Sequence, residues 1–379
     1  MKLQNKQLFV LALFLNLICY QPLSGLAQSN NNSALEQGTN NPENKSAPAI
    51  AGAATCNGGC CCGEFTTPAG IMTAHIHAKK EWMVAYEYMN MSMKGDRMGT
   101  STRSADDLYK QYLMSPQKMT MQMHMVMVMY GVTDRLSLMG MGGYVTNDMT
   151  MTADQPLSCC PPGSNVMKCG ADGIADTRLY ALYSIAAKTN SQLNGSLGVS
   201  APTGSINANG VTVLGNNERL SYDMQPGTGS WALLPAITYL HNLKSFSLGA
   251  EAGGDIKLNK NANGYKTGNA GHLNIWAGHA LLPFLTGTLR GEFVAMDKIT
   301  GADPAINYPY NLRGDPTADA TNSGGKWSTL YAGLTFNFKK PVLQKFRLQV
   351  EYGIPLYQNL NGTQMAAYGN FMAMLQYKF

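Results

Sequence analysis

The stretch that decides the fold is Met119–Tyr130, which reads MTMQMHMVMVMY. Methionine occupies every second position from Met119 to Met129. Alternate residues of a β-strand point to opposite faces, so all these thioethers would share one face of a strand, whereas a helix would spread them around its axis. The stretch therefore predicts a β-strand with one sulfur-lined side.

Similar alternating segments of roughly ten residues recur from Glu81 to the C-terminus, separated by turn-like or polar connections, which is typical of a transmembrane β-barrel. Strands are expected near Trp82–Met93, Lys118–Tyr130, Arg135–Val145, Ile174–Ala186, Gly195–Pro202, Trp231–Leu240, Ser245–Ile256, Gly271–Leu282, Leu285–Met296, Trp327–Phe338, Phe346–Tyr357 and Met365–Phe379. Short and long connections alternate between them, and bacterial barrels have an even strand number with short periplasmic turns. The predicted fold is all-β, a transmembrane up-and-down antiparallel β-barrel of about 12 strands in the bacterial outer membrane.

The N-terminal part predicts export. Two lysines precede an apolar run, Leu8–Cys19, and small residues follow up to Ala27. This pattern predicts a signal peptide over residues 1–27, with a retained membrane anchor as the alternative. Residues 28–80 are rich in Asn, Ser, Gln, Ala and Pro toward their start and are expected to form a disordered, Cys-containing periplasmic segment. The barrel is expected over residues 81–379.

The composition supports the membrane barrel and argues against a nucleic-acid partner. Charged residues make up only 13% of the chain, there are 40 glycines, and tyrosine (19) outnumbers phenylalanine (11). These values suit Gly-rich strands with Tyr at the membrane interfaces, in contact with outer-membrane lipid. The net charge of +5 is weak and indicates no nucleic-acid surface. Phe379, a terminal aromatic residue on an amphipathic strand, resembles the signal that the barrel-assembly machinery reads.

The sulfur-lined face is expected to line the lumen. On the first predicted strand Glu87 lies on the same face as several methionines, and a carboxylate in hydrocarbon would cost several kcal/mol. After the turn that follows Tyr130, Arg135 lies on the face of the odd-numbered residues, which is also the face of the methionine stripe. With this orientation His124 turns outward, among lipid-facing neighbours.

The methionines are concentrated in one part of the chain. Of 24 methionines, 17 lie between Met72 and Met151, so the inner faces of the first three strands would form one thioether wall. Thioethers are soft ligands that favour Cu(I) and Ag(I). The candidate metal ligands are Met89, Met91, Met93, Met119, Met121, Met123, His124, Met125, Met127, Met139 and Met141. The alternative is that Met fills the lumen as a flexible apolar side chain.

The cysteines allow two interpretations. Cys56 and Cys60–Cys62 precede the barrel, and Cys159, Cys160 and Cys169 lie in a long outer loop. They could supply further soft ligands, but disulfides are favoured because the protein is exported. Their number after removal of residues 1–27 is odd, so at least one thiol is free or intermolecular. His75 and His77 are expected to be a solvated periplasmic pair.

Three stretches resemble a known family. They are Gly70–Arg97, Met119–Met125 and Tyr130–Leu136. Together they resemble Met-rich outer-membrane barrels usually described only as transporters, which are similar to the barrels named for the meta-pathway of phenol degradation. The resemblance is specific over roughly Gly70–Ala187. It implies an outer-membrane channel often considered in connection with copper handling, and no established substrate.

The sequence therefore predicts an outer-membrane channel or transporter for a small solute, with soft metal ions such as Cu(I) as the sharper substrate hypothesis. The alternatives are a channel for small apolar or aromatic compounds, or a barrel-anchored metal-binding surface protein. No nucleophile–base pair, phosphate-cradling glycine loop or clustered carboxylate pair points to catalysis, so an enzyme is not expected. No bound cofactor is expected apart from Cu(I) as a candidate.

Overall fold

The computed structural model of the chain describes residues 66–306, 314–338 and 343–379. The predicted signal peptide and the cysteines between Cys56 and Cys62 lie outside these residues. Within the described ranges, no helix is long and apolar enough to cross a bilayer.

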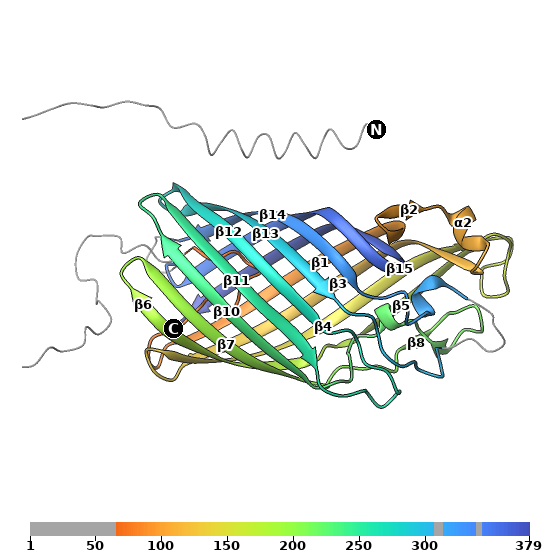
Figure 1. The fold of residues 1–379 in the computed structure, drawn as a ribbon, viewed down its shortest axis with the longest axis horizontal. Coiled ribbons are helices and arrows are strands. Elements are labelled where there is room, and N and C mark those ends of the chain that lie inside the picture. The colour runs from red at the N-terminus through yellow and green to blue at the C-terminus, as the bar shows by residue number, and fades with distance from the viewer. Residues whose placement is uncertain (1–65, 307–313, 339–342) are drawn as a thin grey trace, which may run out of the picture. The chain divides into compact units, whose positions relative to one another are not determined.

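The described residues form a closed antiparallel β-barrel whose strands are tilted relative to the barrel axis (Figure 1). Its strands, in order around the wall, are β1 (Trp82–Gly99), β3 (Met114–Gly131), β4 (Leu136–Ala153), β6 (Thr177–Lys188), β7 (Ser191–Ala201), β10 (Ala232–Asn242), β11 (Phe246–Lys257), β12 (Ala270–Leu282), β13 (Leu285–Met296), β14 (Gly325–Asn337) and β15 (Phe346–Lys378). The barrel closes because β1 pairs with β3 on one side and with β15 on the other.

The last strand, β15, crosses the wall twice. Its residues 347–360 pair with β14, and residues 360–378 pair with β1. Both Arg347 and Lys378 lie at the end of the barrel where β1 begins, so the chain reverses near Gly362, which has a φ of 68°. The eleven strands of the ring thus make twelve passes through the wall, as the alternating segments predicted.

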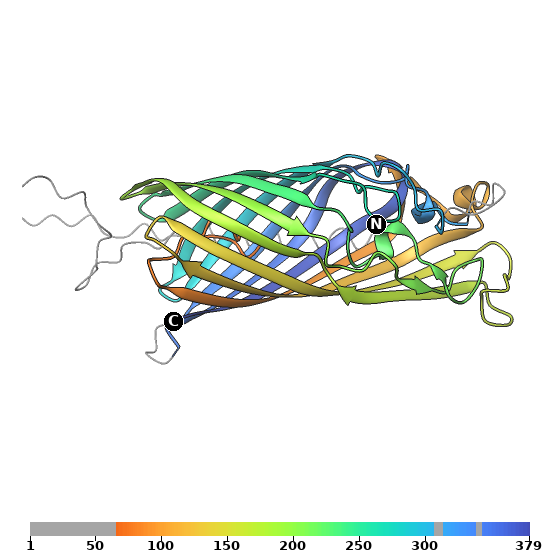
Figure 2. The ribbon, with the colours of Figure 1, turned by 90° about the horizontal axis from the view of Figure 1, so that it is seen from below.

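Smaller elements lie at the end with the long connections, which is the extracellular end in bacterial barrels (Figures 1 and 2). They are β2 (Ser101–Arg103), α2 (Ala105–Tyr109), β5 (Val166–Ile174), β8 (Asn209–Gly210), β9 (Glu218–Arg219), and the 3-10 turns η1 (Tyr222–Met224) and η3 (Pro316–Ala318). Pairing continues above the barrel, since β5 forms a ladder with the outer half of β4. The strands β3 and β4 are therefore longer than their predicted lengths.

The two faces of the wall differ as their sequence pattern predicts. On β3, Val126 is 52% exposed and Val128 39%, whereas Met127 and Met129 are 0% exposed. Exposed apolar side chains on the outside of a barrel suit contact with lipid. The methionine stripe consequently faces inward, as predicted from Glu87, which is itself buried.

Residues 66–80, called the inner segment below, are ordered, whereas they were expected to belong to a disordered periplasmic segment. The backbone carbonyl oxygens of Thr66, Thr67 and Ala74 accept hydrogen bonds from Trp276, Gln349 and Asn194, which belong to three different strands. The segment therefore lies inside the barrel at its periplasmic end (Figure 2). These long-range hydrogen bonds explain why it is ordered. His75 and His77 are correspondingly not a solvated pair, since His77 is 2% exposed and His75 contacts the Thr67 hydroxyl at 3.0 Å.

Candidate functional site

Inward-facing methionines stand opposite one another across neighbouring strands. Met89 of β1 is in register with Met123 of β3 on one side and with Met372 of β15 on the other. Side chains directly opposite each other on an antiparallel pair are within contact reach, about 5 Å between Cβ atoms. We call such a cross-strand set a rung, and this set the middle rung.

A second rung lies near the periplasmic end and a third near the extracellular end. In the lower rung, Met83 of β1, Met129 of β3 and Met139 of β4 are in register and almost fully buried. The upper rung extends over four strands because Met149 of β4 also pairs with Cys169 of β5. Its members are Met93, Met119, Met149 and Cys169.

The upper rung belongs to a larger cluster of buried sulfur-bearing side chains, called the upper sulfur cluster. It contains Met114, Met119, Met149, Met151, Met167, Met224, Met365, Cys160 and Cys169, with Met93, Met121 and Cys159 packed against it. Met224 belongs to the connection between β7 and β10. Its backbone carbonyl oxygen accepts a hydrogen bond from the Asn147 side chain of β4 at 3.2 Å. This connection therefore folds inward over the thioether wall.

The cysteines of the outer loop are free thiols, which corrects the preference for disulfides among the described cysteines. The Sγ atoms of Cys159 and Cys160 are 3.9 Å apart, and adjacent cysteines rarely bridge each other. Burial, together with a hydrogen bond to Cys160, raises the pKa of the Cys159 thiol to about 11. The thiol is thus protonated at neutral pH, and a bound metal would have to displace its proton.

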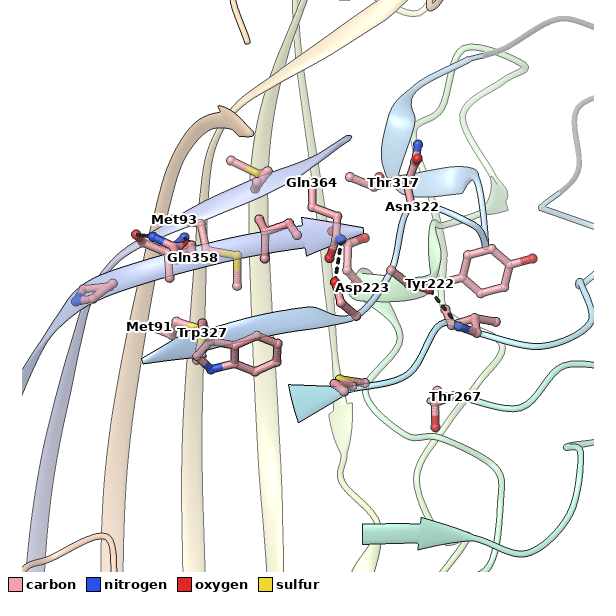
Figure 3. A pocket seen from close by; sticks show the side chains of 18 of the residues that line it. Met91, Met93, Tyr222, Asp223, Thr267, Thr317, Asn322, Trp327, Gln358 and Gln364 are labelled. Carbon is pink, nitrogen blue, oxygen red and sulfur yellow. Dashed lines mark hydrogen bonds between the residues drawn. The ribbon is translucent and has the colours of Figure 1, made fainter. Parts of the chain in front are cut away.

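A chamber of about 340 Å³ lies beside the upper sulfur cluster. Figure 3 shows Met91, Met93 and Trp327 on one side of it and Tyr222 and Asp223 of η1 on the other. Burial inside the barrel, with a smaller contribution from the Asp315 carboxylate, raises the pKa of Asp223 to about 7. No lysine or arginine is among the described residues that line this upper chamber.

A lower chamber of about 370 Å³ lies nearer the periplasmic end, against the inner segment. Its methionines are Met72 of the inner segment and Met89, Met125, Met139, Met141 and Met372 of the wall. Its carboxylate, guanidinium and imidazole side chains are Glu87, Arg178, Glu251, Asp255 and His272. Asp255 pairs with Lys257 at 2.9 Å, and His272 Nε2 lies 3.5 Å from Glu251 Oε1. Carboxylates thus outnumber the cationic side chains around a thioether surface.

Most of the sequence-predicted ligands lie in the two chambers, in the rungs or in the upper sulfur cluster. Met89, Met125, Met139 and Met141 line the lower chamber, and Met91 and Met93 line the upper one. Met119 and Met121 belong to the upper sulfur cluster, Met127 is buried beside the lower rung, and Met123 completes the middle rung.

His124 is the exception. It lies on the outer face, where its Nδ1 is hydrogen-bonded to the Tyr86 hydroxyl at 2.7 Å and its ring is 5.2 Å from that of Tyr88. The reason is strand parity, because residue 124 points away from its odd-numbered neighbours. His124 cannot share a ligand set with the inward methionines. Among the described residues, no group of three or more His, Cys, Asp or Glu side chains is arranged to hold a metal ion.

Sequence reasoning missed several sulfur donors. Met372 and Met374 alternate on β15 in the same way as the stripe, so their inward direction was readable from the sequence. Their place beside β1 was not, because it depends on barrel closure. Met72 and Met224 reach the lumen from non-strand segments that have no periodic signal.

Solved structures include one that shares the fold of this chain and others that are weaker matches. An outer membrane channel from Pseudomonas putida F1 has a TM-score of 0.52 at 13% identity, covering 80% of this chain and 97% of that one. The Ralstonia pickettii toluene transporter TbuX has a TM-score of 0.37 at 11% identity, covering 80% of this chain and 90% of that one. The first likeness shows the fold, and with the closed antiparallel wall and apolar outer face it defines an outer-membrane β-barrel.

The family follows from sequence. Residues 129–338 match the family described as "Putative MetA-pathway of phenol degradation", and because they make up more than half of the chain, the protein belongs to this family. No curated protein matches the chain by sequence.

Proposed function

We propose that the barrel is a passive outer-membrane channel whose substrate is a soft metal cation, with Cu(I) as the first candidate. The observation that carries the proposal is the succession of inward-facing sulfur rungs. The upper rung with Cys169, the middle rung around Met89 and the lower rung around Met83 follow one another along the same strands. An ion would pass between them by exchanging one thioether for the next.

The chemistry of the lining supports a soft cation. Thioethers favour Cu(I) and Ag(I) over hard cations, and they bind without carrying charge. The carboxylates of Glu87 and Glu251 in the lower chamber favour a positive ion, as does Asp223 when it is ionised in the upper chamber. Neutral ligands with nearby carboxylates suit conduction, since the ion must both enter and leave.

The inner segment also favours a small substrate. It crosses the periplasmic end, where side chains of several strands donate hydrogen bonds to its backbone carbonyl oxygens. A single ion passing along Met72 and the wall methionines needs little space. A bulkier solute needs the inner segment to move, at the cost of these hydrogen bonds.

A second candidate substrate is a small apolar or aromatic compound. The upper chamber has a volume typical of small-molecule pockets, and Trp327, Ile299 and Leu360 contribute apolar surface to it. The family description, which names phenol degradation, is consistent with this candidate. A third candidate, a barrel-anchored metal-binding surface protein, would depend on Cys159, Cys160 and Cys169 alone.

The test is flux into proteoliposomes that carry the purified barrel. Replacing Met89, Met123 and Met372 with leucine keeps apolar volume but removes the middle rung, and such swaps usually cost less than about 1.5 kcal/mol each. We expect Ag(I) or Cu(I) influx to fall at least about tenfold, as loss of about 1.4 kcal/mol of favourable interaction implies. Met98→Leu is the matched control, since Met98 lies near the extracellular end and is 46% exposed.

The outcomes separate the candidates. Unchanged metal influx in the triple variant contradicts the rung mechanism. Flux of phenol or toluene that exceeds metal flux, in the native protein and the variant alike, favours the apolar-solute channel. Loss of metal binding on replacing only the three loop cysteines with alanine, without any measurable flux in the native protein, favours the surface-binding protein.

A further inference from the structure

Three lysines form a rung of their own on the outer face near the extracellular end. Lys94 of β1 is in register with Lys118 of β3, Lys118 with Thr150 of β4, and Thr150 with Lys168 of β5. All three lysines are exposed. None of them forms an ion pair with a residue that the structure describes.

This arrangement is unfavourable without an anion. Like charges directly opposite each other on an antiparallel pair are destabilising, and Lys94 and Lys118 are such a pair. Two carboxylates share the outer face below the lysines. Asp148 lies one outward-facing position below Thr150, beside Gly170, and Asp172 accepts a hydrogen bond from the Tyr144 hydroxyl. Neither stands in the lysine rung.

The height of the rung places it at the outer leaflet's headgroups. Trp82, whose ring centroid lies 4.5 Å from that of Tyr130, marks the periplasmic interface on the same strands. Lys94 follows Trp82 by twelve residues on β1, which is about 40 Å along a strand and about 30 Å along the membrane normal at the usual tilt. The apolar band of such barrels is about 25 Å tall.

Aromatic side chains face outward about midway between Trp82 and the lysine rung. Tyr88, His124 and Phe371 form an outward-facing aromatic group, with ring centroids 5.2 Å and 6.4 Å apart for the two pairs that include Tyr88. The lysines lie a further six residues along the strands, where the long stem of a lysine lets its ammonium group reach a lipid phosphate.

We propose that Lys94, Lys118 and Lys168 form a binding site for the phosphate groups of an outer-leaflet glycolipid of the lipopolysaccharide type. Each ammonium group acts as a point charge toward a phosphate oxygen, and Thr150, between Lys118 and Lys168, adds a hydroxyl donor. A membrane lipid is the expected source of the phosphates, because the rung faces outward from the wall about 30 Å along the membrane normal from the periplasmic interface. The site is independent of any transport through the lumen.

The test compares the triple variant Lys94→Gln, Lys118→Gln, Lys168→Gln with the control Lys326→Gln. Lys326 is also exposed at the extracellular end of the wall, but its register partners are Ala295 and Asn359. The folded-to-unfolded transition is followed by heat-dependent mobility in neutral detergent, with and without added lipopolysaccharide. We expect lipopolysaccharide to raise the unfolding midpoint of the native protein and of the control equally. The triple variant should bind at least tenfold more weakly, so that it needs at least tenfold more lipopolysaccharide for the same rise in midpoint.

Two further arms make the result decisive. Dephosphorylated lipopolysaccharide should leave the midpoint of the native protein unchanged, and inorganic phosphate at equal concentration should do the same. Without lipid, the triple variant should be at least as stable as the native protein, because its opposed charges are gone. Equal lipopolysaccharide binding by the native protein and the triple variant overturns the proposal, and so does a full response to inorganic phosphate or to the dephosphorylated lipid.

Discussion

Inside the barrel, Arg290 Nη2 lies 3.0 Å from Glu351 Oε2, and the backbone N–H of Gly70 donates to the same carboxylate oxygen at 3.1 Å. The two side chains are only 2% and 1% exposed. The Arg290 guanidinium also stacks over the Tyr331 ring, 3.8 Å from its centroid. One buried ion pair thus fixes the inner segment to two strands, β13 and β15.

Glu351→Gln is expected to destabilise the barrel and loosen the inner segment. Arg290 would keep only the more distant Glu292, at 3.5 Å, as an ionic partner. Leaving a buried charge without its partner typically costs 3–5 kcal/mol, so we expect a loss of about 3 kcal/mol in the free energy of unfolding. Urea unfolding in vesicles, followed by Trp fluorescence, measures the loss, and planar-bilayer conductance should rise. The exposed Glu218→Gln is the control. Unchanged conductance would show that the ion pair does not hold the segment.

Gly131→Ala tests the inner segment without altering charge. Lys80 donates its backbone N–H to the Gly131 carbonyl oxygen at 2.7 Å, and a Cβ at residue 131 would overlap the carbonyl oxygen of Ala78. Because backbone cannot yield as a flexible side chain does, residues 77–80 should be displaced, at a cost of about 1–3 kcal/mol. Faster tryptic cleavage after Lys79 and Lys80 would report this. Gly142→Ala, where a Cβ meets nothing within 4 Å, should leave the cleavage rate unchanged.

The wall of the barrel was predictable because each strand carries its own signal. The two-residue period of Met119–Met129 and the inward Glu87 were sufficient to orient β1 and β3, and the structure confirms this orientation. The turn after Gly131 is short, so neighbours in sequence are neighbours in the sheet. Local pattern and tertiary structure agree in such a meander.

The contents of the lumen were not predictable for the opposite reason. Gly70 is hydrogen-bonded to Glu351, and Thr67 to Gln349, across separations of 281 and 282 residues. The inner segment has no periodicity of its own, and its order depends on a wall that forms from distant strands. The inward fold of Met224 depends likewise on Asn147. The sequence predicted the thioether wall but could not predict which segments pack against it.

Glu81 should make a pH-dependent contribution to stability where the inner segment joins β1. The pKa of Glu81 is lowered from 4.5 to about 2, chiefly by a hydrogen bond from His77. The Lys378 charge and the Ala78 N–H also lower this pKa, whereas partial burial of the carboxyl group opposes the decrease. A lowered carboxyl pKa stabilises the fold above the unfolded pKa, and the contribution disappears as pH falls from about 4.5 through about 2. Since Glu81 is partly exposed, we expect Glu81→Gln to cost about 1 kcal/mol at pH 7. Unfolding midpoints at pH 7 and pH 2 measure this cost. A difference between native protein and variant that is as large at pH 2 as at pH 7 would contradict this assignment.

Asp223 should couple the inward-folded connection between β7 and β10 to pH near neutrality. Its pKa is raised from 3.8 to about 7 by burial, while the Ser221 hydroxyl, which donates to Asp223 Oδ1 at 2.8 Å, partly opposes the increase. A raised carboxyl pKa means that the folded arrangement is most stable below the unfolded pKa of 3.8 and loses stability as pH rises through 7. We therefore expect η1 to leave its place beside the upper chamber more often at pH 8 than at pH 6, with a rise in single-channel conductance between these values.

Asp223→Asn removes the titrating group and keeps a side chain of the same size, so its conductance should be constant between pH 6 and pH 8. Asp148→Asn, on the outer face of β4, is the matched control and should retain the pH dependence of the native protein. The native protein and both variants must first show the same conductance at pH 6, where Asp223 is mostly protonated and the native carboxyl group resembles the amide. A conductance rise that persists in Asp223→Asn would place the responsible group elsewhere, whereas its loss in that variant alone ties the inward fold of η1 to a single carboxyl group.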